Sequence, residues 1–164
     1  MIDINDSSFE SGSLVGTKWA NSANIQLRKY EDWLGKPPSL YPNVEAVWFA
    51  YLTASGTYTC GLADPNQYGI PVATWTKARM GIHAFKPSAT AVNITLGVKL
   101  YNHLGVYLRD VTILSSRPIT EEWAWYGSPD ASAVDLGQTG FAYAVPWVQV
   151  SNPCSIDLLV VDDG

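Results

Sequence analysis

Two segments of the chain carry aromatic and polar side chains at most of their alternate positions. The first row contains Phe141, Tyr143, Trp147 and Gln149, and the second contains Trp75, Lys77, Arg79 and His83. Alternate residues of a β-strand point to the same side, so each row would cover one face of a strand. Aromatic rings bury the C–H faces of sugars while neighbouring polar groups bond the hydroxyls. Both rows are therefore candidates for carbohydrate recognition.

A third row comes from the clearest strand pattern in the sequence, residues 92–101. One alternate set is apolar (Val92, Ile94, Leu96, Val98 and Leu100) and the other is mostly polar (Asn93, Thr95, Lys99 and Tyr101). Such alternation predicts one buried and one solvated face. The candidate binding residues are Trp75, Arg79, His83, Lys99, Tyr101, Tyr143, Trp147 and Gln149. The alternative stays open that these aromatic side chains close the ends of a sandwich or pack between subunits.

The same residue types offer little for catalysis. Glu121 and Glu122 are adjacent, so on a strand they face opposite sides and cannot form the facing carboxylate pair of a glycosidase. No nucleophile motif accompanies His83, His103 or Asp110, and the chain has no glycine-rich phosphate loop. We therefore expect a protein that is not an enzyme.

The elements that must position these rows are short strands. Their expected ranges are 24–29, 45–54, 57–62, 73–85, 91–101, 106–114, 121–126, 141–150 and 155–161. This spacing predicts an all-β fold, a two-sheet antiparallel β-sandwich. Loops are expected at residues 30–43, 64–69 and 128–130, with one helical turn near 29–34. Pro146 should disturb its strand locally.

Composition narrows the function classes. A chain of 164 residues fits one domain, 1–164. With a net charge of −5 and no cluster of Lys or Arg, it is a poor candidate for nucleic acid or an anionic membrane surface. No apolar stretch could span a bilayer, so we expect no membrane insertion. The segment Met1–Asp6 does not resemble a secretion signal, which indicates cytoplasmic synthesis or a piece of a larger protein.

The two cysteines, Cys60 and Cys154, do not form a disulfide framework. The simpler interpretation is two reduced, semi-buried thiols. A disulfide across so long a loop, contributing about 4 kcal/mol in the chain-entropy model, is the alternative.

Both ends of the chain and parts of its middle carry a family resemblance. The carrying segments are Asp6-Ser7-Ser8-Phe9-Glu10-Ser11-Gly12, Val72–Arg79, Glu121-Glu122-Trp123, Ala142-x-Ala144 with Val148-x-Val150, and Ser155-Ile156-Asp157-Leu158-Leu159-Val160-Val161. Together they resemble the jelly-roll carbohydrate-binding modules of families 4, 9 and 22. The resemblance implies a two-sheet jelly roll, a concave open face that holds a glycan, and no catalytic activity.

The resemblance also implies a calcium ion that ties the N-terminal segment to the last strand. Glu10 and Asp157 match the family positions for the carboxylate ligands, and Asp6 and Ser8 are near enough in sequence to add oxygens. Leu158 stands where a second Asp is usual. Alternatively, Glu10 pairs with a backbone N–H or a Lys and no ion is bound.

Several functions are consistent with this resemblance. Met-initiated copies of such modules resemble small phage tail proteins, which favours a virion-associated, minor tail-type protein that binds host-envelope glycan beside other virion subunits. The alternatives are a structural or decoration subunit whose aromatic face assembles a homo-oligomer, and a carbohydrate-binding module cut from a larger glycoside hydrolase.

Overall fold

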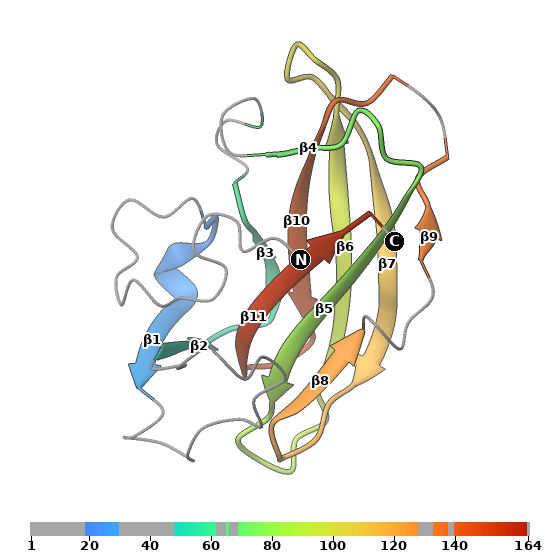
Figure 1. Cartoon of the computed structure of the whole chain (residues 1–164). Coiled ribbons are helices and arrows are strands. Elements are labelled where there is room, and N and C mark those ends of the chain that lie inside the picture. Colours follow the sequence, from blue (N-terminus) through green and yellow to red (C-terminus); the bar gives the residue numbers. More distant parts are fainter. Residues whose placement is uncertain are drawn as a thin grey trace.

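The computed structural model describes residues 19–29, 48–61, 65, 69–127, 133–137 and 140–163. A single 3₁₀ turn, η1 (Ser22–Asn24), precedes the first strand. The strands that follow are β1 (Ile25–Lys29), β2 (Trp48–Leu52), β3 (Gly56–Thr59), β4 (Ile70–Pro71), β5 (Lys77–Phe85), β6 (Asn93–Tyr101), β7 (Tyr107–Pro118), β8 (Ala124–Gly127), β9 (Val134–Asp135), β10 (Tyr143–Val150) and β11 (Cys154–Asp162) (Figure 1).

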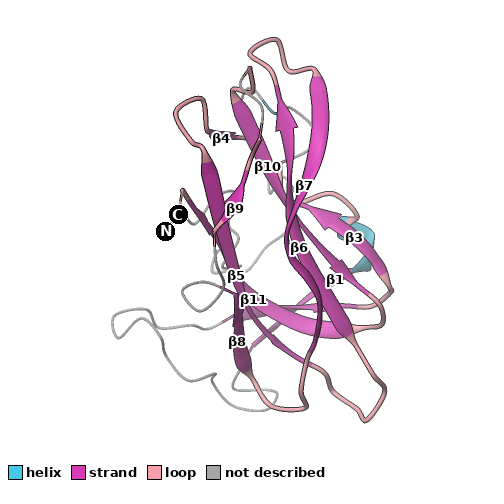
Figure 2. Ribbon diagram, turned by 90° about the vertical axis from the view of Figure 1, so that its right-hand side faces the viewer, coloured by secondary structure: helices cyan, strands magenta, loops and turns pink. Residues whose placement is uncertain are grey.

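These strands form two antiparallel sheets. One has the order β1-β2-β11-β5-β8, with β9 also paired to β5, and the other has the order β3-β10-β6-β7, with β4 also paired to β10. Figure 2 shows the two layers from the side, with β5 and β8 in one and β6, β7 and β10 in the other. The predicted all-β, two-sheet antiparallel sandwich is therefore confirmed.

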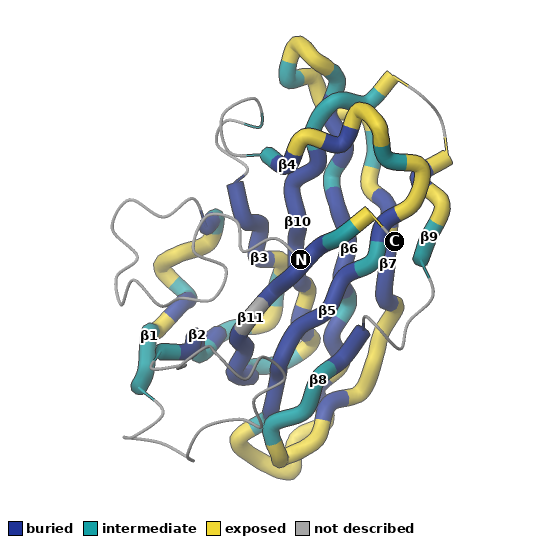
Figure 3. The backbone as a smooth tube through the Cα atoms, in the orientation of Figure 1, coloured by how far each residue is buried: buried dark blue, intermediate teal, exposed yellow. Residues whose placement is uncertain are grey.

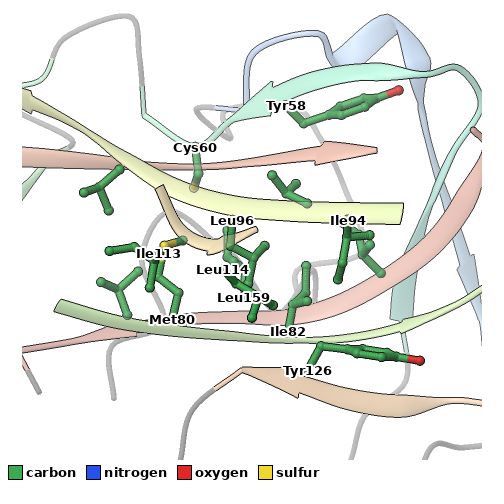
Figure 4. Close-up of a cluster of buried hydrophobic side chains, with 14 of the residues drawn as sticks. Tyr58, Cys60, Met80, Ile82, Ile94, Leu96, Ile113, Leu114, Tyr126 and Leu159 are labelled. Atoms are coloured by element: carbon green, nitrogen blue, oxygen red, sulfur yellow. The ribbon is translucent and has the colours of Figure 1, made fainter. Parts of the chain in front are cut away.

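The core fills the space between the two sheets (Figure 4). On β6 the apolar set alternates inward as predicted, and Ile94, Leu96 and Leu100 are completely buried. The facing sheet contributes Met80 and Ile82 from β5. Each sheet thus buries one face, and the opposite face of each points away from the core.

The chain changes sheets between β5 and β6. β5 lies between β11 and β8, whereas β6 lies between β10 and β7 in the other sheet. The residues of β5 and β6 that point away from the core therefore lie on opposite sides of the molecule. This crossover decides which candidate residues can act together.

All nine predicted strands are present, with boundaries that differ by a few residues, and two short strands, β4 and β9, were not predicted. The prediction for residues 121–126 needs correction, because β8 begins only at Ala124. Glu121 and Glu122 lie in an exposed bend instead of on opposite faces of a strand.

The prediction that Pro146 disturbs its strand is wrong. Pro146 is buried inside β10 and opposes Val98 of β6. Its carbonyl accepts a hydrogen bond from the Cys60 amide at 2.9 Å. Because the N and O of one residue point to the same side of a strand, the missing N–H faces the region just past the end of β3. The ladder between β10 and β6 loses no hydrogen bond.

The two thiols belong to different sheets, since Cys60 follows β3 and Cys154 begins β11. Both are buried and no disulfide joins them. Burial raises the pKa of Cys154 to about 12, so this thiol stays protonated.

Several expectations lie wholly or mostly outside the described ranges: the N-terminal motif with Glu10, the loops at 30–43, 64–69 and 128–130, and the helical turn near 29–34. Of that turn only Lys29 is described, as the last residue of β1. The single-domain assignment stays a prediction. No helix in the described part of the chain is long and apolar enough to cross a membrane.

Candidate functional site

The outward face of the five-stranded sheet brings five of the eight candidate residues together. They are Lys99, Tyr101, Tyr143, Trp147 and Gln149. The antiparallel register aligns them in rows across the strands: Tyr143 pairs with Tyr101, Trp147 with Gly97, and Gln149 with Thr95. Tyr101 in turn pairs with Tyr107 of β7. We call Tyr143, Tyr101 and Tyr107 the tyrosine row.

The tyrosine row extends to β7 because of a tight hairpin and a β-bulge. Tyr101 pairs with Tyr107 while Leu100 pairs with Arg109, so Leu108 is an extra residue on β7. Without this bulge, Tyr107 and Asp110 would point to opposite faces. With it, the Tyr107 hydroxyl donates a hydrogen bond to Asp110 Oδ2 at 3.1 Å.

Tyr107 and Asp110 are absent from the sequence-based set. The predicted strands, 91–101 and 106–114, leave a four-residue connection, which would pair Tyr101 with Val106. The observed connection has five residues because β7 begins at Tyr107, and this places Tyr107 beside Tyr101. The bulge at Leu108, which brings Asp110 to the same face, has no comparable signal in the sequence.

The part of this face next to the hairpin forms a connected polar and aromatic group. Lys99 Nζ lies 3.1 Å from Asp110 Oδ1 and 5.5 Å from the centre of the Tyr107 ring. The Tyr101 and Tyr107 rings meet edge to face, with centroids 5.8 Å apart. Tyr107 is 49% exposed, so its ring is available to a ligand. Aromatic surface and hydrogen-bonding groups therefore lie side by side.

The electrostatics keep both phenols neutral. Burial, together with the negative charge of Asp110, raises the pKa of Tyr101 above its ordinary value. Partial desolvation and the hydrogen bond to Asp110 do the same for the pKa of Tyr107. Because Asp110 is paired with Lys99, this part of the surface offers hydroxyl groups and one compensated ion pair, with no uncompensated charge.

Trp147 packs against the neighbouring strand and offers little accessible surface to a ligand. Its indole lies across Gly97 of the neighbouring strand, where a side-chain carbon at position 97 would come within 2.6 Å of Trp147 Cε2. Trp147 is only 8% exposed, and its Nε1 is buried with no hydrogen-bond partner among the described residues. Tyr101 is equally buried, which leaves Tyr107 as the most accessible ring of the tyrosine row.

The other three candidates, Trp75, Arg79 and His83, do not join this face. Arg79 and His83 belong to β5 in the six-stranded sheet, on the opposite side of the molecule. Arg79 Nε bonds Asp162 Oδ1 at 3.0 Å. Trp75 lies in the connection between β4 and β5, half-buried against the core. The expected single binding surface is therefore corrected: five of the eight residues lie on the outward face of the five-stranded sheet, two lie on the six-stranded sheet, and Trp75 lies on neither.

The outward face of the six-stranded sheet is closed around His83. The imidazole is 2% exposed, and the rings of Trp123 and Trp125 pack against it at 6.5 and 5.1 Å. Phe49 and Phe85 pack on Trp123 and are also buried. Desolvation lowers the pKa of His83 to about 4, so the ring is neutral. In this closed state His83 cannot reach a ligand.

Asp157, the candidate calcium ligand of the last strand, lies on this closed face opposite His83. It is buried, as is Ser155 two residues earlier, whose Oγ has no partner among the described residues. Glu10 lies outside those residues. Nowhere in the described part of the chain do three or more His, Cys, Asp or Glu side chains gather in a metal-binding arrangement. Calcium binding thus stays a prediction.

Comparison with solved structures gives the fold a set of relatives. The family 22 xylan-binding domain of Paenibacillus barcinonensis Xyn10C superposes with a TM-score of 0.52 at 6% identity, covering 89% of this chain and 85% of that one. The C-terminal family 22 module of Clostridium thermocellum Xyn10B gives 0.52 at 14% identity, covering 95% and 89%. The enzymatically active domain of bacteriophage CBA120 tailspike protein 4 gives 0.54 at 7% identity, covering 97% of this chain but 21% of that one.

At the level of sequence, neither a family model nor a curated protein matches the chain. At identities this low the structural likeness concerns the fold alone. Within that limit the resemblance found in the sequence is confirmed: the chain has the two-sheet jelly-roll fold of the family 22 carbohydrate-binding modules.

Proposed function

We propose that this protein is a non-catalytic module that binds a neutral polysaccharide on the outward face of its five-stranded sheet. The observation that carries the proposal is the accessible Tyr107 ring beside the Lys99–Asp110 pair. The ring provides an apolar plane for a sugar, while the charged pair and the phenol provide hydrogen bonds at its edge. The fold supports the proposal, since solved relatives include xylan-binding domains.

The chemistry of the face favours a neutral sugar and no hydrolysis. The Lys99 charge is compensated by Asp110, so an acidic polymer would gain little. A glycosidase needs two carboxyl groups on either side of the scissile bond. The described part of the tyrosine-row surface provides one carboxylate, Asp110, and that one is already paired.

The test is affinity for soluble polysaccharides, with xylan, mixed-linkage glucan and arabinogalactan as probes in calorimetry or affinity electrophoresis. Tyr107→Ala should weaken binding about tenfold or more, which corresponds to about 1.4 kcal/mol for a central aromatic contact. Tyr107→Phe keeps the ring and should lose much less.

The control belongs on the opposite side of the molecule. Tyr51 is a half-buried tyrosine on the six-stranded sheet, with the Arg28 guanidinium 4.0 Å from its ring centre. Tyr51→Ala should leave polysaccharide affinity unchanged. Equal losses in Tyr51→Ala and Tyr107→Ala would contradict the assignment of the binding face.

For the biological setting, we propose a virion-associated role of the minor tail type, with host-envelope glycan as ligand and other virion subunits as neighbours. The support is the fold likeness to a phage tailspike domain together with the N-terminal sequence pattern. A module from a glycoside hydrolase is the rival, supported by the family 22 relatives. Immunogold labelling of virus particles would distinguish these two roles, because a glycoside hydrolase module would be absent from the particles.

A structural calcium ion linking Glu10 to Asp157 is a further part of the proposal. Calcium takes six to eight oxygen ligands, and no three His, Cys, Asp or Glu side chains gather in the described part of the chain. The proposed ion therefore needs Glu10 from outside that part. An ion bound only by the native state stabilises it by mass action. Chelator should therefore lower the melting temperature of the wild type but not of Asp157→Asn. A melting temperature that ignores chelator and added calcium removes the ion from the proposal.

The second candidate function is assembly. Trp147 and Tyr101 point away from the core but are largely buried, so these two rings offer a sugar little free surface. If the protein is an assembly subunit, its outward face would contact other subunits, or copies of the same chain in a homo-oligomer. Polysaccharides would then have no effect on the protein.

A further inference from the structure

The hairpin between β6 and β7 gathers several exposed apolar side chains. Four large apolar side chains are exposed among the described residues, and all four belong to this hairpin: Leu104 at 70%, Val106 at 55%, Tyr107 at 49% and Leu108 at 45%. The hairpin projects from one end of the sandwich and is mostly exposed (Figure 3). We call residues 102–108 the hairpin tip. Contiguous exposed apolar groups usually mark a contact with another surface.

The hairpin tip is also free of strong charge and bonds its own backbone. No Asp, Glu, Lys or Arg occurs between Asn102 and Leu108. The Asn102 side-chain oxygen accepts hydrogen bonds from the Leu104 and Val106 amides at 2.9 and 3.0 Å. The Gly105 amide bonds the Asn102 carbonyl, and the Asn102 amide bonds the Val106 carbonyl, both at 3.0 Å. Four amides of the tip therefore need no water.

These features of the hairpin tip favour a lipid surface over a protein surface as its partner. An apolar medium offers backbone groups no hydrogen bonds, so a segment that enters it must satisfy its amides internally. Below the tip, the tyrosine row places phenols at the depth where tyrosine is enriched at membrane–water boundaries. The exposed apolar area is on the order of a few hundred Å². A stable protein interface buries about 800 Å² per partner, so the tip alone is too small for one.

We propose that the hairpin tip inserts shallowly into the apolar layer of a lipid surface. Leu104 and Val106 enter, while Tyr107 remains at the boundary. The surface is a neutral or zwitterionic one, because Lys99 is paired with Asp110 and the whole chain is acidic. The other nearby cation, Arg109, follows the tip directly, but its guanidinium lies against Gly137 with Nη2 buried. This shallow contact differs from bilayer-spanning insertion and from electrostatic adsorption, the two membrane modes that the sequence disfavours.

The proposal stands independently of glycan binding. The tip lies at the same end of the sheet as the tyrosine row and shares Tyr107 with it, so a lipid surface and a glycan attached to it could be contacted together. Two weak contacts at one surface would reinforce each other through effective concentration. The test therefore leaves Tyr107 unchanged and uses vesicles without glycan.

The experiment is flotation of the full chain with phosphatidylcholine vesicles. The wild type should float with the vesicles to an extent that added salt does not reduce, since no charge pairing is involved. The variant Leu104→Ser/Val106→Ser should reduce the vesicle-bound fraction at least fivefold, with an unchanged melting temperature because both side chains are exposed.

A matched control lies at the opposite end of the sandwich. Ala89 and Ala91 are exposed in the connection between β5 and β6, and Ala89→Ser/Ala91→Ser should bind vesicles like the wild type. Absence of wild-type flotation, equal binding by the tip variant, or loss of binding in salt would each overturn the proposal. A change in the solution mass of the lipid-free chain on making the tip variant would reassign the tip to self-association.

Discussion

At the scale of single residues, His83 and Tyr107 illustrate opposite uses of a polar side chain. Both come from positions that point away from the core. Tyr107 is accessible and hydrogen-bonded to Asp110, whereas His83 is enclosed by Trp123 and Trp125. Strand alternation identifies His83 as outward-pointing, but it cannot say whether another part of the molecule covers that side. It does not identify Tyr107, which reaches the outward face through the bulge at Leu108. The proposed binding role therefore passes to Tyr107, and His83 becomes a determinant of stability.

The buried imidazole predicts a stability that falls in mild acid. The pKa of His83 is about 4 in the folded chain, against an ordinary value of 6.5. The unfolded state therefore binds the proton more readily, and the contribution of neutral His83 is complete above pH 6.5. It is lost progressively as the pH falls from 6.5 toward 4, up to about 3 kcal/mol. Urea unfolding at several pH values would measure it.

The chain has one other histidine to serve as the control. His103 is exposed in the hairpin tip, so His103→Gln should keep the full pH dependence. His83→Gln removes the titrating group and should flatten the profile between pH 6.5 and 4. Asp157, opposite His83 on β11, is the nearest acidic group in the described sheet, so the comparison should be repeated in Asp157→Asn. A wild-type profile as flat as that of His83→Gln would refute the assignment.

At the scale of elements, the sequence predicts strands well and their partners poorly. The alternation in β6 predicts its two faces correctly, because hydrophobic burial enforces period two within a strand. The same reasoning placed Arg79 and His83 with Lys99 and Tyr101. That grouping fails because β5 pairs with β11 and β8, while β6 pairs with β10 and β7. Pairing between distant strands depends on the whole set of contacts, which local alternation does not encode.

The short elements escape prediction for a related reason. β4 and β9 have two residues each, too few for any periodic pattern. The bulge at Leu108 and the tolerated Pro146 likewise depend on where a neighbouring strand begins or ends. These local irregularities shape the candidate site, since the bulge brings Asp110 to Tyr107.

One contact between neighbouring strands gives a quantitative prediction. Gly97 leaves room for the Trp147 indole, and a side-chain carbon there would also approach the Val111 carbonyl oxygen to 2.7 Å. Gly97→Ala should destabilise the fold by about 2 kcal/mol through overpacking, and Trp147→Ala by about 3 kcal/mol through lost burial. Because the first change acts partly by displacing the indole, the double variant should be more stable than the sum of the two losses predicts.

The measurement is a double-mutant cycle from urea unfolding of the four proteins. A coupling energy above about 1 kcal/mol supports the direct contact. Trp125 offers a parallel on the other sheet, where it lies across Gly81 with Cε2 2.8 Å from a side-chain carbon placed at that position. Gly81→Ala combined with Trp147→Ala should show no coupling, because the two pairs lie on opposite faces.

At the scale of the whole molecule, the two candidate functions predict different behaviour in solution. A binding module works as an independent unit. The large exposed apolar side chains of the described residues are confined to one hairpin, whose area is small compared with a stable interface. We therefore expect a monomer by light scattering at micromolar concentration. Adding a polysaccharide that the chain binds should raise the scattering mass, and Tyr107→Ala should suppress the increase while remaining monomeric. An assembly subunit would instead give an oligomer whose mass does not change when polysaccharide is added. Its subunit contacts would then be located by substituting the outward-facing Gln149 and Thr112. A polysaccharide bound at Tyr107 need not touch these two residues.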